Sequence, residues 1–245
     1  MPDERIRKQY GIDELLKRLP EDAAHFYSGF APWPEDLEGW TRTSRELLPA
    51  EGDRSLIRTV WDLQKDRESR LLVDVTECDS APDAIESLAG SLEANQLASL
   101  STGLRGNSFV SFVHPEGAPP ASFMAYANLL VVVASFGRKP VPVDPLVKRL
   151  LQRLESSSES RSEFGRLIAE PAHPRRSQEV LLRYELSVLP TEDSYLRFSV
   201  TGGTILRRQG QLFLRPAAAS RIEVSSWLFE RGRETRSMRL TLPIE

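Results

Sequence analysis

The stretch that decides the fold is Leu196–Ile244, which reads LRFSVTGGTILRRQGQLFLRPAAASRIEVSSWLFERGRETRSMRLTLPI. Short apolar runs alternate in it with turn signals such as Gly202–Gly203 and Gln209–Gly210. With the residues just before it, this pattern predicts six strands: Val180–Leu189, Tyr195–Thr201, Gly203–Arg208, Gln211–Arg215, Arg221–Glu230 and Thr235–Leu242. Several short strands at this spacing are typical of a β-sandwich.

The order of strands and turns in this stretch resembles bacterial immunoglobulin-like (Ig-like) domains of the cadherin, polycystic-kidney-disease or fibronectin type. The resemblance implies an Ig-like β-sandwich over residues 176–245 and a role in adhesion, spacing or docking. Apart from Glu192–Asp193, the acidic residues that bind calcium in cadherin-type modules are not evident. Cys78 is the single cysteine, which excludes an intramolecular disulfide. We therefore expect neither calcium bridging nor disulfide stapling.

The front of the chain mixes helical and strand patterns. The predicted helices are Gly11–Pro20, a short turn in Ala23–Phe30, one capped by Ser80, and one capped by Asp144 with Pro145 at its first position. The predicted extended segments are Trp40–Glu46, Ser55–Gln64, Arg70–Cys78, Ser108–Val113 and Ser122–Ser135. By layout alone, this order is similar to small extracytoplasmic α+β domains such as the PsbP-like group.

The predicted fold class is therefore α+β, with an N-terminal antiparallel sheet and packed helices followed by a C-terminal Ig-like β-sandwich. The serine-rich segment Glu155–Ser162 marks a domain boundary. We predict an N-terminal helical segment (1–35), an α+β domain (36–157), a linker (158–175) and the sandwich (176–245). A mildly acidic front and a mildly basic back agree with two units.

Familiar catalytic signatures are missing from the sequence. His25, His114 and His173 are dispersed, and no HExxH, GxSxG, GxGxxG or P-loop motif occurs. We therefore predict no catalytic residue, metal or cofactor, and no enzyme activity. The net charge of −3 gives no field that favours nucleic acid. The apolar run Leu129–Ser135 is too short to span a membrane, and the first residues lack the apolar core of a signal peptide.

Two sets of residues are candidates for contact with a protein partner. Trp33, between two prolines, either anchors a partner or pins the linker to its own domain. Four arginines of the C-terminal part either form a docking face or belong to a salt-bridged surface: Arg207, Arg208, Arg231 and Arg233. A separate candidate is the glycine-rich segment 103–107, where Arg105 and Asn107 either bind an anion or form a turn before the next strand.

The sequence thus favours a non-catalytic interaction or assembly protein that docks on a protein partner, outside the cytoplasm or on a membrane complex. A cytoplasmic location is the alternative, because the sequence shows no targeting segment. One alternative function is an enzyme or small-anion-binding protein with an interdomain cleft. Another is a carbohydrate-binding module that uses Trp33 or Trp227.

Overall fold

A computed structural model describes residues 4–19, 23–50, 54–95, 101–105, 108–113, 119–156, 162–187, 190–217 and 219–245. These residues form an α+β structure in which antiparallel strands make three sheets and helices are few. The chain divides into two compact units. The first, called here the α+β unit, takes its described residues from 4–19 and 31–156. The second, called here the two-sheet unit, takes them from 23–30 and 162–245.

The α+β unit is built on a seven-stranded sheet with the order β2-β3-β4-β8-β7-β6-β5. The strands are β2 (Trp40–Pro49), β3 (Ser55–Leu63), β4 (Asp66–Glu77), β5 (Ser101–Arg105), β6 (Ser108–Val113), β7 (Ala121–Tyr126) and β8 (Leu129–Gly137). Alternation decides which side chains are buried: Leu71, Val73 and Val75 of β4 have no exposed surface. On the opposite face, the register partners Arg58 and Asp74 form a bidentate pair at 2.8 and 2.7 Å.

Helices α1 (Glu4–Gln9), α2 (Ile12–Lys17) and α3 (Ala81–Ala94) lie together on one face of this sheet. Leu88 and Leu92 of α3 share a hydrophobic cluster with Phe123 of β7 and Leu130 of β8. The Ser80 hydroxyl caps α3 by accepting a hydrogen bond from the Asp83 backbone N–H. Helix α4 (Asp144–Glu155) packs on the short 3₁₀ helix η1 (Pro34–Leu37). In the part of the chain that the structure describes, no helix is long and apolar enough to cross a membrane.

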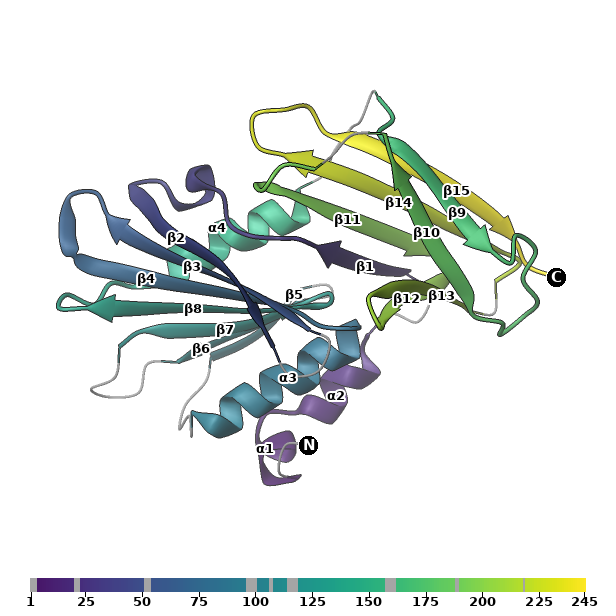
Figure 1. The fold of residues 1–245 in the computed structure, drawn as a ribbon. Helices are drawn as coiled ribbons and strands as arrows, with labels where there is room; N and C mark the ends of the chain where they lie inside the picture. The colour runs from purple at the N-terminus through teal and green to yellow at the C-terminus, as the bar shows by residue number, and fades with distance from the viewer. Residues whose placement is uncertain are drawn as a thin grey trace. The chain divides into compact units, whose positions relative to one another are not determined.

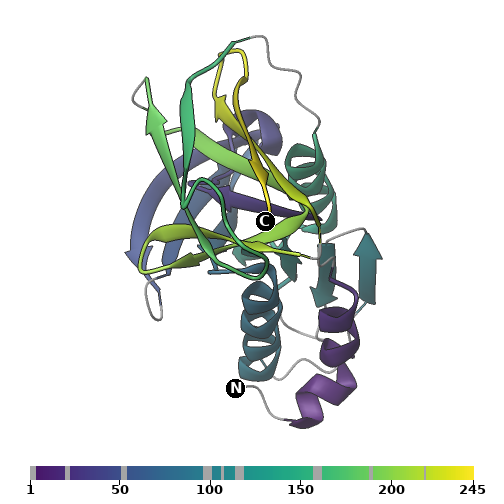
Figure 2. The same ribbon diagram turned by 90° about the vertical axis from the view of Figure 1, so that its right-hand side faces the viewer.

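The two-sheet unit consists of two four-stranded antiparallel sheets, with the orders β1-β11-β14-β15 and β12-β13-β10-β9. Its strands are β1 (Ala23–Ser28), β9 (Gly165–Glu170), β10 (Val180–Leu186), β11 (Ser194–Thr201), β12 (Gly203–Arg208), β13 (Gln211–Pro216), β14 (Arg221–Glu230) and β15 (Arg236–Pro243). Figures 1 and 2 show purple β1 beside the green strand β11, although more than half of the chain separates them.

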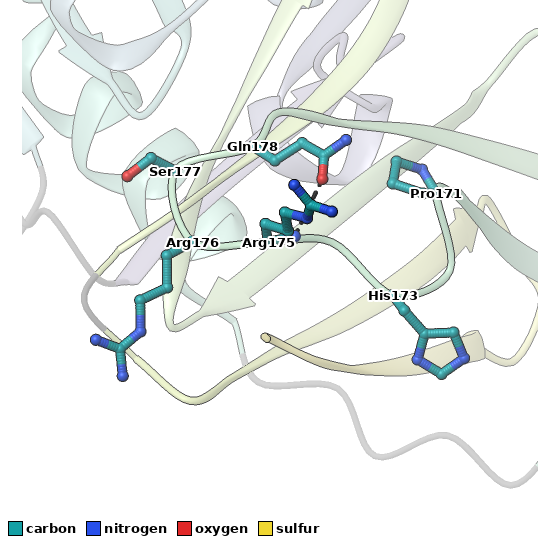
Figure 3. Close-up of a pocket in the computed structure, with 6 residues that line it drawn as sticks. All are labelled: Pro171, His173, Arg175, Arg176, Ser177 and Gln178. Carbon is teal, nitrogen blue, oxygen red and sulfur yellow. Dashed lines mark hydrogen bonds between the residues drawn. The ribbon is translucent and has the colours of Figure 1, made fainter.

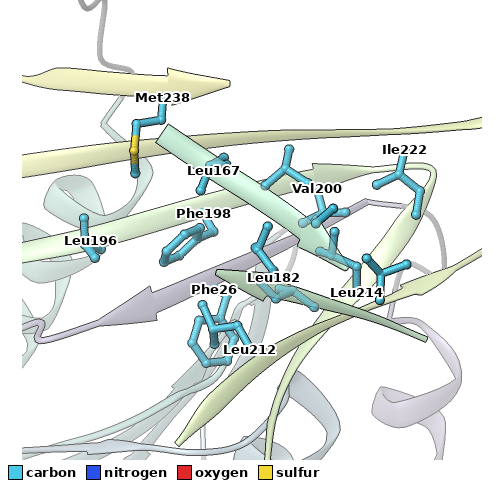
Figure 4. Packing of buried hydrophobic residues seen from close by; sticks show 14 of the residues in the cluster. Phe26, Leu167, Leu182, Leu196, Phe198, Val200, Leu212, Leu214, Ile222 and Met238 are labelled. Atoms are coloured by element: carbon cyan, nitrogen blue, oxygen red, sulfur yellow. The ribbon is translucent and has the colours of Figure 1, made fainter. Parts of the chain in front are cut away.

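Both sheets share one hydrophobic core, to which every one of the eight strands contributes (Figure 4). Phe26 of β1, Leu182 of β10 and Phe198 of β11 are at most 2% exposed. Burial of a side chain of this size stabilises a fold by roughly 1.5–3 kcal/mol. Edge strands of the two sheets also meet, because β1 contacts β12 and β9 contacts β15. The two-sheet unit therefore closes on both sides around its core.

Strands β10 to β15 lie where the sequence predicts six strands, with ends shifted by a few residues at most. The helical turn predicted for Ala23–Phe30 is wrong, because this segment forms β1. The predicted linker 158–175 contains β9, so the two-sheet unit has eight strands. Both segments become strands through pairing that a local pattern does not reveal: β1 pairs with the distant β11, and β9 with β10.

The predicted order of elements in the α+β unit also needs correction. Segment Ser122–Ser135 is two strands, because Ala127 adopts a positive φ of 50° and begins a turn to β8. Glycine or asparagine commonly marks such a position, and alanine gives no such signal. β5 occupies residues expected to be a loop, and β2 continues to Pro49. Helix α4 starts one residue early, with Val143 at the capping position and Asp144 as its first residue.

Candidate functional site

The loop between β9 and β10, residues 171–179, carries three basic side chains on an exposed surface. His173, Arg175 and Arg176 are all exposed. The backbone of this loop is held in place: the Gln178 N–H donates to the Arg175 carbonyl at 3.0 Å, and the Arg175 N–H donates to Gln178 Oε1 at 3.0 Å. The Arg176 N–H donates to the Glu245 carbonyl, and the Glu245 N–H donates to the Pro174 carbonyl, each at 3.0 Å. We call residues 171–178 the cationic loop.

The cationic loop borders a hollow of about 520 Å³ lined by Pro171, His173, Arg175, Arg176, Ser177 and Gln178. Small-molecule pockets of this size have mostly apolar walls that enclose the ligand. The residues that line this hollow are exposed, and its walls are polar and apolar in about equal shares. Figure 3 shows that the side chains of Arg176 and His173 point in different directions, and that Arg175 lies beside Gln178. The hollow therefore suits a large charged surface better than an enclosed small molecule.

Arg175 and Arg176 differ from most arginines of the two-sheet unit in their ion pairing. Among described residues, neither guanidinium has a carboxylate partner. Eight other arginines pair with an acidic residue of the same unit: Arg166, Arg183, Arg208, Arg215, Arg221, Arg231, Arg233 and Arg236. Arg239 of β15 is likewise without a carboxylate partner among the described residues. The cationic loop is thus a place where positive charge is left uncompensated.

Glu179, the first acidic residue after the cationic loop, does not neutralise it. Its carboxylate accepts hydrogen bonds from Arg208 of β12 at 2.7 Å and from Arg215 of β13 at 2.9 Å. These hydrogen bonds, led by the one from Arg215, hold the pKa of Glu179 below its usual range. Both oxygens of this carboxylate are therefore occupied by the neighbouring strands.

The four arginines predicted as a docking face do not gather in one place. Arg207 and Arg208 end β12, whereas Arg231 and Arg233 follow β14 in the other sheet. Arg208 pairs with Glu179, Arg231 lies 4.0 Å from Asp193, and Arg233 lies 3.3 Å from Glu230. Glu230 is itself 2% exposed and also pairs with Arg236. These contacts fit the alternative expectation of a salt-bridged surface.

Trp33 lies in a buried polar contact of the α+β unit. The Arg153 guanidinium stacks 4.1 Å from the centre of the Trp33 ring. The backbone N–H of Trp33 donates to Asp36 Oδ2 at 2.8 Å. Arg153 also donates to Asp36 Oδ1 at 2.9 Å. Trp33 is only 8% exposed, so these contacts favour the alternative in which it pins the segment to its own domain.

The structure does not bring the other candidate residues together into one site. Arg105 ends β5 and Asn107 lies outside the described residues, so the anion site proposed for them has no described geometry. Trp227 is half-buried, and the Arg197 guanidinium stacks 4.8 Å from its ring centre. His25 lies in β1, His173 lies in the cationic loop, and His114 is outside the described residues. Within the described ranges, no group of three or more His, Cys, Asp or Glu residues is arranged to hold a metal.

The cationic loop was not singled out from the sequence, although the sequence carries a signal for it. Residues 171–178 read PAHPRRSQ, with three basic side chains and no acidic one. Charge alone does not show that the arginines stay unpaired, because Arg208 and Arg215 find Glu179 across strands. No protein-family model matches the chain, and neither a curated protein nor a solved structure matches it significantly.

Proposed function

We propose that this protein is a non-catalytic docking protein whose two-sheet unit, acting as an Ig-like module, binds an acidic protein partner through the cationic loop. One observation carries this proposal: Arg175 and Arg176 have no carboxylate partner among described residues, while the arginines of neighbouring strands are paired. An acidic surface of a partner would supply the missing charges. Complementary charge of this kind guides association and sets the register of an interface.

Enzymatic use of the hollow has weaker support. The side chains of Arg176 and His173 diverge, so they do not converge on one reacting atom (Figure 3). Catalysis requires a nucleophile or base with an orienting partner in a site that excludes water. The exposed walls of the hollow lack this arrangement, which is why docking is the better proposal.

Site-specific photo-crosslinking tests the proposed function. A photoreactive amino acid at the exposed Ser177, which leaves both arginines in place, should crosslink one defined partner in cells. The same group at Arg166, which is exposed on β9 but paired with Glu185 at 2.6 Å, should not. Equal crosslinking from both positions, or none from position 177, would refute docking through the loop.

We further propose that the protein works outside the cytoplasm or on a membrane complex, with a cytoplasmic location as the alternative. Cell fractionation with an antibody against the full chain tests this placement separately. Recovery in the cytoplasmic fraction would remove the proposed location and leave the docking surface as it stands.

A further inference from the structure

We infer that the cationic loop recognises an extended protein segment with several Asp or Glu residues, rather than a single phosphate or other small anion. This inference rests on the proposed function and names the chemistry of the partner. The deciding feature is the direction of the charged groups. Arg175 and Arg176 are neighbours in sequence, yet Arg176 points away from Arg175 and from His173 (Figure 3). One tetrahedral anion cannot bind guanidinium groups that diverge, whereas successive carboxylates of an extended chain can reach each of them.

The same unit contains an example of the contact that we expect. The Glu179 carboxylate is shared by two guanidinium groups, with hydrogen bonds of 2.7 Å from Arg208 and 2.9 Å from Arg215. Charge-assisted hydrogen bonds of this kind are stronger than neutral ones. An acidic segment would give Arg175 and Arg176 what Glu179 already gives to Arg208 and Arg215.

Three backbone hydrogen bonds tie the C-terminal residues, which include the exposed acidic Glu245, to the loop and to the start of β14. Glu245 bonds to Pro174 and Arg176, and Ile244 donates to the Ser220 carbonyl at 2.9 Å. This brings Arg221, at the start of β14, to the same end of the unit. Arg221 is 69% exposed and shares its charge with Glu223 at 2.9 Å. A partner segment that follows this path passes two unpaired guanidinium groups and one paired group.

Two other modes of binding fit the two-sheet unit less well. Addition of a partner strand takes place along a sheet edge, whereas Arg175 and Arg176 lie in the loop between β9 and β10. Single-stranded nucleic acid binds through aromatic side chains on which bases stack. Residues 171–178 contain no Phe, Tyr or Trp. Of the three modes of binding, docking of an acidic segment on the loop fits the two-sheet unit best.

The test measures binding of a short fluorescent peptide, in which Glu alternates with Ser, to the full chain by anisotropy at low and physiological salt. A peptide with Gln in place of Glu is the neutral comparison, and inorganic phosphate is the competitor. We expect Arg175→Gln and Arg176→Gln each to weaken binding about fivefold, since an exposed ion pair contributes up to about 1 kcal/mol. Arg183→Gln on β10 is the matched control, because Arg183 already pairs with Glu170 at 3.2 Å, and it should change affinity less than about twofold.

Equal binding of the Gln peptide, displacement by phosphate as effective as by unlabelled acidic peptide, or full affinity in the double variant would overturn the inference. Binding of an oligonucleotide in preference to the peptide would overturn it as well. If photo-crosslinking from position 177 still captures one partner when the acidic peptide fails to bind, the inference fails and the docking function stands. If both fail, the cationic loop is not a docking site.

Discussion

Phe26 of β1 and Phe198 of β11 are register partners whose ring centroids lie 6.5 Å apart in an edge-to-face arrangement. This contact joins an early segment of the chain to a sheet formed otherwise by late segments. Both rings are essentially fully buried in the core of the two-sheet unit. The cationic loop belongs to the same unit, so the surface proposed for docking depends on a core that β1 completes.

Truncation of the Phe26 side chain tests that dependence. Phe26→Ala should lower the free energy of unfolding of the two-sheet unit by about 3–5 kcal/mol, because it leaves a cavity in a well-packed core. Urea denaturation followed by circular dichroism measures the change. Leu47→Ala is the control, since Leu47 is 68% exposed, and it should have an effect within about 0.5 kcal/mol. A similar small effect for Phe26→Ala would show that β1 is dispensable.

The Arg153–Asp36 pair beneath Trp33 gives a second prediction. Arg153→Met should destabilise the α+β unit by about 2 kcal/mol at pH 7, because it leaves the buried Asp36 carboxylate without its cation. Adding Asp36→Asn should recover part of this loss, and a double-mutant cycle measures the coupling. Arg149→Met is the control, since Arg149 lies 3.8 Å from an exposed Glu38. Additive effects of the two changes would contradict the coupling.

The same pair predicts a pH dependence with a definite sign. Burial already raises the pKa of Asp36 above its usual value, against the opposing effects of the Trp33 N–H and of Arg153. Without Arg153 this pKa should rise further, so the protonated carboxyl is favoured in the folded state. Stability lost in Arg153→Met should therefore be smallest at acidic pH and grow as the pH rises through the folded pKa. A loss that is constant with pH would contradict this account.

His25 provides a pH test in the opposite direction. Burial, followed by the charge of Arg197, lowers the pKa of His25 below its ordinary 6.5, so the folded state favours the neutral ring. Its contribution to stability is present above pH 6.5 and is lost as the pH falls toward the folded pKa. The wild-type protein should therefore lose more stability than His25→Gln between pH 7 and about pH 5. Parallel stability curves for the two proteins would exclude this role.

Cys78 should react slowly with thiol reagents in the folded protein. Burial raises the pKa of its thiol to about 11, against an ordinary value of 9.0. Because the thiolate is the reacting species, the rate of labelling at pH 8 should be about 100-fold or more below that in concentrated guanidinium chloride. Rapid labelling of native protein by Ellman's reagent would show that Cys78 is accessible.

Local chemistry is what made much of the fold predictable. Helix α3 forms where the sequence predicts a cap: the Ser80 hydroxyl accepts from the Asp83 N–H, while the Asp83 carboxylate accepts from the Asp79 N–H. The strand pattern from Val180 onward likewise follows from alternation and glycine turns. By contrast, β1 was missed because its structure depends on pairing with β11, which lies far along the chain. Propensity within a few residues carries no information about such a partner.

The candidate site was harder to predict for a related reason. Arg208 and the arginines of the cationic loop all lie in arginine-rich stretches of the sequence. No neighbouring residue in the sequence shows which of these arginines will form an ion pair. The difference appears only when the sheet brings Glu179 to Arg208 and Arg215, while Arg175 has no carboxylate partner in the part of the chain that the structure describes. Which arginines are unpaired is thus a property of strand register rather than of composition.

The most direct test of docking through the cationic loop is a side-chain NMR titration of the full chain with the Glu–Ser peptide. The Nε–Hε signals of arginine report on each guanidinium separately. We predict that the signals of Arg175 and Arg176 shift first and furthest, while those of the paired Arg166 and Arg183 stay in place. Shifts at the paired arginines with none at Arg175 and Arg176 would contradict it.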